Sequence, residues 1–124
     1  MQLDYDLIRT IMLNLETEHI GGTQMLFDSN VDGYTPNEVI GHYHHLIDRG
    51  FIEAEVTGSG SLNLKAQGIL PDGHDFLEAV RDEQIWNKTK KGALQAGGGT
   101  LEILKDLAKG YLKKKVEDTT GIKL

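Results

Sequence analysis

Three groups of residues in this chain have types and spacings that could do chemistry, and the first could bind calcium. Residues 28–33 read Asp-Ser-Asn-Val-Asp-Gly, which matches the first half of an EF-hand loop. The second half fails, because the bidentate acid of such a loop should fall at Val39, and Glu38 comes one place early. A strand, and not the helix that an EF-hand needs, is expected before the loop. We therefore interpret 28–33 as a polar turn.

The second group is a run of three histidines, His42, His44 and His45, whose imidazoles are of a type that often binds metal ions. Successive residues of a helix are turned by about 100°. His45 would therefore point away from the apolar stripe, while His42 and His44 would lie on opposite flanks of it. Ligands aimed in three directions cannot hold one ion, so we expect flank or surface histidines, with no metal site and no cofactor.

The third group, Trp-Asn-Lys-Thr-Lys-Lys at 86–91, combines an aromatic ring with basic residues, as nucleic-acid patches do. A lone Trp usually buries most of its surface, so we expect Trp86 to anchor the core and the lysines to be solvated. No Ser/His/Asp set or acid pair lies in a known motif, and no Gly-rich loop has P-loop or Rossmann spacing. We therefore expect neither enzyme activity nor catalytic residues.

These residues depend for their positions on a central block of helix, hairpin and helix. Thr35 and Pro36 are a typical N-cap and first helical position, and Gly50 is a typical helix end. Apolar and polar residues alternate after Gly50, as they do in half-buried strands. The predicted elements are a helix from Thr35 to Gly50, strands at 52–56 and 62–66, a wing tip at 57–61 and a helix over 72–82.

Further elements extend the block on both sides. An amphipathic helix with Asp4 as its N-cap precedes a short strand at 23–27, which leaves little room before Thr35. The usual second helix must therefore be a brief turn at 34–39 or be fused with the third. A Gly-rich stretch at 92–99 predicts a flexible linker.

We therefore predict an α+β fold: a winged helix-turn-helix domain (1–91), the linker (92–99), and a C-terminal basic amphipathic helix with its tail (100–124). The whole chain should hold three to five helices and a small antiparallel sheet of two or three strands. Thr100 should cap the last helix, whose last turn would hold the lysines at 113–115. The expected core includes Leu26, Ile40, Leu46, Phe51, Leu64 and Phe76.

Charge is divided sharply along the chain. From Met1 to Trp86 there are 4 basic and 15 acidic residues, a net charge of −11, whereas 87–124 holds 9 lysines and 4 acids, a net charge of +5. The predicted winged-helix body is therefore acidic and only the tail is basic. The chain has no cysteine and no apolar run of the roughly 20 residues that a membrane span needs, so we expect a cytoplasmic protein with no membrane partner.

The residues also suggest a family. Leu70-x-x-Gly73-His74-x-Phe76-Leu77, followed by Ile-Trp-Asn-Lys-Thr at 85–89, resembles small uncharacterised phage and prophage proteins of the YjcQ-like winged-helix group. The resemblance covers about residues 3–91, and Pro71 departs from the Thr that those relatives usually carry. It implies a winged-helix fold and a phage origin, and it implies no catalytic residues.

Two functions follow for the body, a protein-interaction module and a DNA-binding transcriptional regulator. The exposed face of the predicted recognition helix carries two acids, which phosphates would repel. It carries no Lys or Arg that could bind phosphates. We therefore rank binding to a basic protein partner above DNA binding. The candidate residues of this face are Asn37, Glu38, Gly41, His45 and Asp48.

The basic tail supplies a third hypothesis, contact with nucleic acid or membrane, which we rank last because acids lie among its lysines and it has no Arg. The apolar stripe of 100–116 is too wide to stand alone in water. We expect this helix either to dock on its own domain or to pair across a homodimer. The candidate basic residues are Lys88, Lys90, Lys91, Lys113, Lys114 and Lys115.

Overall fold

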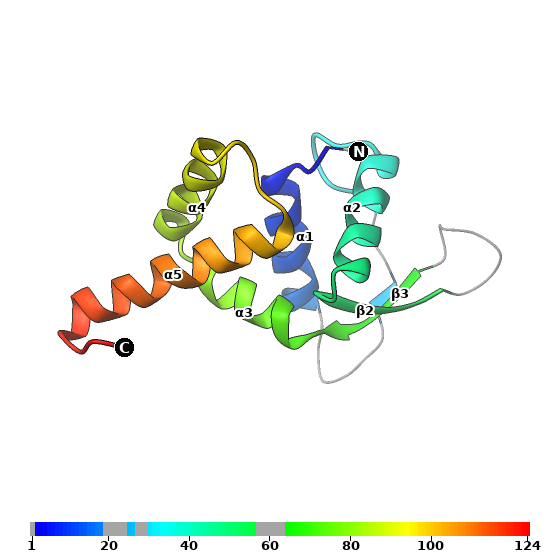
Figure 1. Ribbon diagram of the computed structural model, residues 1–124. Coiled ribbons are helices and arrows are strands. Elements are labelled where there is room, and N and C mark those ends of the chain that lie inside the picture. The colour runs from blue at the N-terminus through cyan, green and yellow to red at the C-terminus, as the bar shows by residue number, and fades with distance from the viewer. Residues whose placement is uncertain (1, 19–24, 27–29, 57–63) are drawn as a thin grey trace. The chain divides into compact units, whose positions relative to one another are not determined.

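The computed structural model describes residues 2–18, 25–26, 30–56 and 64–124, which form helices and one small sheet (Figure 1). The elements are α1 (Tyr5–Glu18), β1 (Met25–Leu26), α2 (Pro36–Asp48), β2 (Ile52–Val56), β3 (Leu64–Ile69), α3 (Pro71–Val80), α4 (Glu83–Gln95) and α5 (Leu101–Thr120). The fold is mostly helical with an antiparallel sheet, so the prediction of an α+β protein is confirmed.

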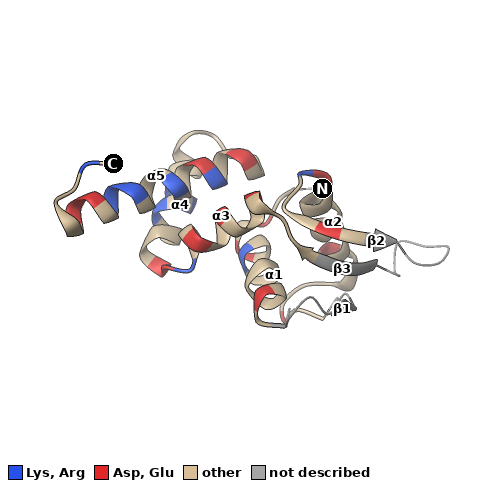
Figure 2. Ribbon diagram, turned by 90° about the horizontal axis from the view of Figure 1, so that it is seen from below, with Lys and Arg blue, Asp and Glu red and all other residues tan. Residues whose placement is uncertain are grey.

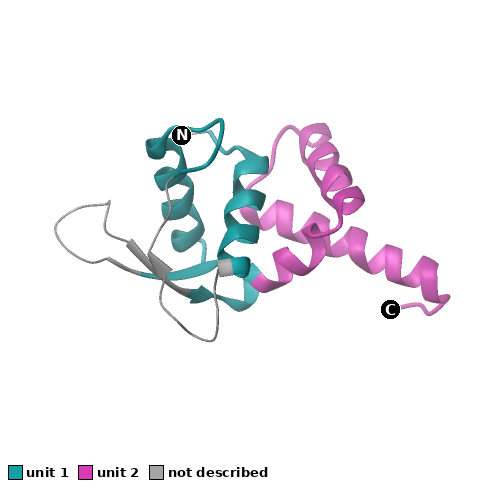
Figure 3. Cartoon of the chain, turned by 180° about the vertical axis from the view of Figure 1, so that it is seen from behind, with its two compact units in different colours: residues 1–73 teal, residues 74–124 magenta. Residues whose placement is uncertain are grey.

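The chain packs as two compact units, residues 1–73 and 74–124, which Figure 3 shows in teal and magenta. Unit 1 holds α1, α2 and the sheet, and unit 2 holds most of α3 together with α4 and α5. Neither unit coincides with the predicted domain of residues 1–91.

In unit 1, α1 forms as its apolar spacing predicts. The carboxylate of Asp4 accepts a hydrogen bond from the backbone N–H of Leu7 at 3.0 Å, which makes Asp4 the predicted N-cap. One face of α1 is buried because its apolar side chains recur every three or four residues. These side chains, all between 0% and 4% exposed, are Leu7, Ile8, Ile11, Met12 and Leu15.

The helix α2 begins at a capping box, in which the Thr35 hydroxyl accepts from the Glu38 N–H and the Glu38 carboxylate accepts from the Thr35 N–H. The described residues 30–35 contain no helix, so the predicted second and third helices are one element. Gly50 follows α2 with φ of 77°, a left-handed conformation that favours glycine, so the predicted end is confirmed.

The sheet has the strand order β1-β3-β2, with both pairs antiparallel. The predicted return strand is β3, which extends farther than predicted, to Ile69, and contains a bulge, while positions 62 and 63 lie outside the described residues. Glu53 pairs with Gly68 and Ala54 with Ala66, which leaves Gln67 unpaired. The hairpin is confirmed, while the predicted wing tip at 57–61 lies outside the described residues.

Gly73 marks a close approach between the start of α3 and the end of α2. A Cβ built on it would lie 2.2 Å from the backbone oxygen of Phe51 and 2.8 Å from a methyl of Ile69. The same Phe51 oxygen accepts the Leu70 N–H at 2.9 Å, so its position is fixed by the chain entering α3. Only glycine fits here, which gives the Leu70-x-x-Gly73 motif a physical meaning.

Two predictions about the segment after α3 were wrong. The predicted helix over 72–82 ends at Val80, because Asp82 instead caps a new helix by accepting the Ile85 N–H at 3.0 Å. The predicted linker over 92–99 is helical through Gln95 as part of α4. The buried face of α4 consists of Ile85, Trp86, Thr89 and Ala93.

The last helix, α5, has the predicted N-cap, since the Thr100 hydroxyl accepts the Ile103 N–H at 3.3 Å. It continues to Thr120 and ends at Gly121, whose φ is 73°. The lysines at 113–115 therefore lie before its last turn, which contradicts that prediction. Within unit 2, α5 packs along α4 and buries Leu101, Leu104 and Ala108, so docking within the chain is the alternative observed.

The predicted core is confirmed where side chains are described. Ile40, Leu46, Phe51 and Phe76 are buried, and the side chains of Leu26 and Leu64 lie outside the described part. Among the helices that the structure describes, none is both long and apolar enough to cross a membrane.

Candidate functional site

The predicted recognition face lies on α2 in unit 1. Asn37, Glu38 and Asp48 are exposed, whereas Gly41 and His45 are half-buried. His42, predicted on a flank of the apolar stripe, is only 2% exposed, so the buried face of α2 includes that flank. The first and last turns of α2 therefore each offer an exposed carboxylate to solvent, and the middle of the helix offers less side-chain surface.

His42 is held in one tautomer by two backbone groups. Its Nε2 lies 2.9 Å from the Asp4 backbone nitrogen, which can only donate, so Nε2 accepts. Its Nδ1 lies 2.7 Å from the Glu38 backbone oxygen, which can only accept, so Nδ1 carries the proton. Both nitrogens of the ring are used, and the ring ties the start of α1 to the first turn of α2. Sequence spacing missed this role because a histidine does not count in an apolar stripe.

Tyr34 shows how charge is arranged beside this link. Burial raises the pKa of the Tyr34 hydroxyl, and a side-chain hydrogen bond to Asp4 raises it further. The negative charges of Asp4, Asp6 and Glu38 act in the same direction on this pKa. The charges of three carboxylates thus act on one hydroxyl, and one of them, Asp4, bonds to it. We call this group, Asp4, Asp6, Tyr34 and Glu38, the acidic helix end.

The other half of the α2 face adds little positive charge. Burial lowers the pKa of His45, and the nearby Arg49 and His42 lower it further against the opposing effect of Asp48. His45 therefore favours its neutral form at neutral pH. In Figure 2 the blue segments of Lys and Arg are most frequent on α4 and α5.

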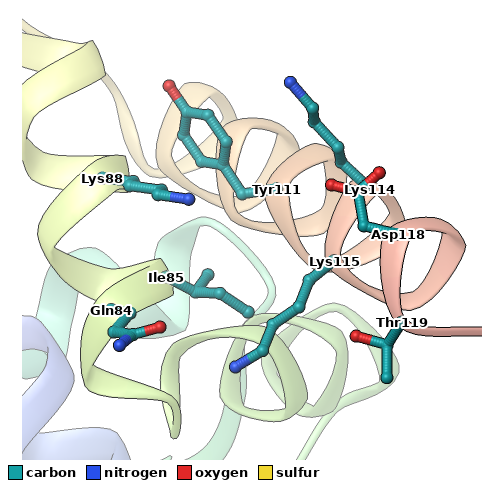
Figure 4. Close-up of a pocket in the computed structure, with 8 residues that line it drawn as sticks. All are labelled: Gln84, Ile85, Lys88, Tyr111, Lys114, Lys115, Asp118 and Thr119. Atoms are coloured by element: carbon teal, nitrogen blue, oxygen red, sulfur yellow. The ribbon is translucent and has the colours of Figure 1, made fainter.

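Three of the six predicted basic residues meet in unit 2. Lys88 from α4 and Lys114 and Lys115 from α5 line a cavity of about 450 Å³ (Figure 4). Lys115 forms an ion pair with Asp82, and this hydrogen bond, with that of the Ile85 N–H, lowers the pKa of the Asp82 carboxyl. The remaining lining residues are Gln84, Ile85, Tyr111, Asp118 and Thr119.

The other predicted basic residues lie elsewhere. The Lys90 ammonium lies 5.6 Å from the centre of the Trp86 ring, a cation–π contact. Trp86 is 2% exposed and meets Phe76 edge to face at 6.1 Å, so the prediction of a core anchor is confirmed. Its ring is not available for stacking on bases. Lys91 and Lys113 are exposed and do not line the cavity.

The described residues hold no group of three or more His, Cys, Asp or Glu side chains placed to bind a metal ion. Two of the six residues of the predicted polar turn, at 28 and 29, lie outside the described part. His44 is half-buried, and His42 is bonded as above. The arrangement in the described chain is therefore one of charged surfaces, with a cavity of unit 2 that is lined by three lysines.

Comparison with known proteins places the chain among relatives. Residues 2–99 match the family described as "Hypothetical protein (DUF2513)". An uncharacterised protein of Haemophilus influenzae is 31% identical over 91 residues, which are 73% of this chain and 76% of that protein. No solved structure matches the chain. The family match includes the acidic helix end and stops before α5.

Proposed function

The chain belongs to the DUF2513 family, and we propose that it is a protein-interaction module of the winged-helix type that binds a basic protein surface through α2. The observation that carries this proposal is the acidic helix end, where Asp4 caps α1, Glu38 caps α2 and the His42 ring joins the backbones of these two residues. The winged-helix assignment is supported by the order of elements, in which α2 is followed directly by the β2–β3 hairpin and α3.

The position of the acids on α2 argues against DNA as the partner. In helix-turn-helix proteins the N-terminal residues of the recognition helix approach the base edges between two phosphate backbones. Here that turn carries Glu38, with Asp4 and Asp6 acting on the same hydroxyl. Unit 1 as a whole has eleven acidic and three basic residues, a net charge of −8. The electrostatic term that dominates non-specific DNA binding would therefore oppose it.

A basic protein surface would instead gain from the same charges. Complementary potentials raise association rates and select partners, and their effect falls as salt rises. The partner that we propose is a phage or host nucleic-acid-binding protein in the cytoplasm, since such proteins carry basic surfaces. The resemblance to YjcQ-like phage proteins supports a phage or prophage origin.

The test compares two doubly neutralised variants of the full chain. Glu38→Gln with Asp48→Asn removes two charges from α2, and Gln can keep the capping hydrogen bond to Thr35. The control is Asp32→Asn with Glu53→Gln, two exposed acids of unit 1 that lie off α2. We expect a basic protein captured from host extract by the wild type and the control to be lost with the α2 variant. Equal loss with both variants would contradict a role for α2.

DNA binding by the regulator alternative is measured on the same proteins. Fluorescence anisotropy with random duplex DNA and host operator pools should show no binding in the micromolar range or tighter, at low and at physiological salt. DNA binding that strengthens as salt falls and changes in the α2 variant would contradict the protein-interaction module. That result would support the DNA-binding regulator.

A further inference from the structure

Unit 2 contains a second feature that the proposed function does not use, the cavity between α4 and α5. We propose that this cavity binds a small organic molecule that carries a phosphate group. The proposal is independent of the acidic helix end, because all eight lining residues belong to unit 2.

The size and lining of the cavity fit a small ligand. Its volume of about 450 Å³ falls in the range of small-molecule sites, roughly 300 to 1,000 Å³. Such sites combine apolar surface with a few polar groups that fix orientation. Ile85 and the Tyr111 ring supply apolar surface, while the Gln84 amide and Thr119 hydroxyl can donate hydrogen bonds to phosphate oxygens.

The charges of the lining favour an anion. The lining contains three lysines and one acid, Asp118. Asp82 pairs with Lys115, whereas Lys88 and Lys114 form no ion pair with any residue that the structure describes. Lysine is a common phosphate ligand that acts as a point charge. Figure 4 shows Lys88 reaching from α4 toward Tyr111 on α5.

One wall of the cavity is fixed by a close approach of the two helices. A Cβ added to Gly92 would lie 2.8 Å from the Tyr111 hydroxyl oxygen, so any larger residue would displace the tyrosine. Glycine inside a helix is otherwise unfavourable, and α4 accepts it at this position. The glycine lets Tyr111 lie against α4, which keeps the ring at the edge of the cavity.

A small phosphorylated ligand fits better than a nucleic-acid strand. Strand-binding proteins spread lysines along a groove and stack bases on exposed aromatic rings. Here Lys91 and Lys113 do not line the cavity, and Trp86 is buried. Three of the lysines of unit 2 therefore line one cavity, which matches a compact anion.

The experiment is an NMR titration of the full chain with adenosine monophosphate, and adenosine is the matched ligand without phosphate. We expect saturable shifts of the backbone amides of Lys88, Tyr111 and Thr119 with the monophosphate and none with adenosine. Lys88→Gln with Lys114→Gln should weaken binding about tenfold or more, since two charge-assisted contacts are lost. Both side chains are exposed, so the variant should fold, which a thermal unfolding measurement checks.

The control variant is Lys91→Gln with Lys123→Gln, which removes the same charge from exposed positions outside the cavity. It should change the affinity less than about twofold, because salt screens distant charges. Equal weakening by both variants, equal shifts with adenosine, or the absence of saturable shifts would each overturn the proposal. So would tighter binding of a single-stranded oligonucleotide that the two variants weaken equally.

Discussion

The two units use charged residues in opposite ways. Unit 1 has a net charge of −8, and its acidic helix end is set by backbone links, with Asp4 and Glu38 both acting as capping residues. Unit 2 has ten basic and eight acidic residues, a net charge of +2, and most of its charged side chains are exposed, although Asp82 caps α4 and Lys105 is buried. In unit 1 the charge pattern depends on the fold. In unit 2 the charge pattern depends on the spacing of exposed side chains along the helices. Substitutions of charged residues should therefore affect mainly stability in unit 1 and mainly binding in unit 2.

The largest expected effect is that of Gly73→Ala in unit 1. The new methyl would lie 2.2 Å from a backbone oxygen that cannot move aside like a side chain, so we expect a loss of about 3 kcal/mol or more in the free energy of unfolding. Chemical denaturation measures it. The control is Gly110→Ala in α5, where a Cβ meets no heavy atom within 4 Å and should stabilise the chain by about 0.5–1 kcal/mol. A neutral Gly73→Ala would show that α3 is not fixed by this contact.

A smaller loss is expected from His42→Ala. It removes a buried ring and leaves the Asp4 N–H without its acceptor, so we expect a loss of about 2 kcal/mol in the free energy of unfolding. The same measurement on His44→Ala, a half-buried histidine of the same helix, should give about 0.5 kcal/mol or less. Similar losses for both variants would show that the hydrogen bonds of His42 to Asp4 and Glu38 add no stability beyond that of an ordinary half-buried histidine.

The smallest expected effect is the loss, at acid pH, of the stability that the Asp82–Lys115 ion pair gives unit 2. The pKa of Asp82 is lowered from 3.8, first by the hydrogen bond from Lys115, so the ion pair stabilises the folded state above that pH. As pH falls through the lowered pKa, the carboxyl is protonated and this contribution is lost. The thermal midpoint of the wild type should therefore exceed that of Lys115→Gln slightly at pH 5, and the difference should shrink as pH falls below 3.8. A constant difference would mean that Lys115 acts through packing.

Local signals predicted much of unit 1. Thr35, Pro36 and Gly50 act within a few residues of their own positions, so the cap and the end of α2 follow from the sequence. The hydrogen bonds of His42 could not be predicted in this way. His42 and Asp4 are 38 positions apart, and only the packing of α1 on α2 brings them together. The cavity was missed for a related reason, since its lysines come from two helices.

The error over α4 has a different cause. Gly92 and the three glycines at 97–99 made a linker the natural interpretation of 92–99. The helix reaches Gln95 because Trp86, Thr89 and Ala93 bury one face and Tyr111 lies over Gly92. Tertiary packing therefore outweighs the weak helical preference of glycine here. The acids at 82 and 83 were a cap signal for a new helix, which was hidden by interpreting 72–82 as a single helix.

The bulge in β3 has a consequence for how this family can change over evolution. If Gln67 were deleted, Ala54 would still face Ala66 and Glu53 would still face Gly68, because the bulged residue is the one without a partner. Deletion of a neighbouring paired residue would instead shift the ladder and move side chains to the opposite face of the sheet. Position 67 is therefore where β3 can lose a residue at least cost, and single-residue gaps among relatives should concentrate there.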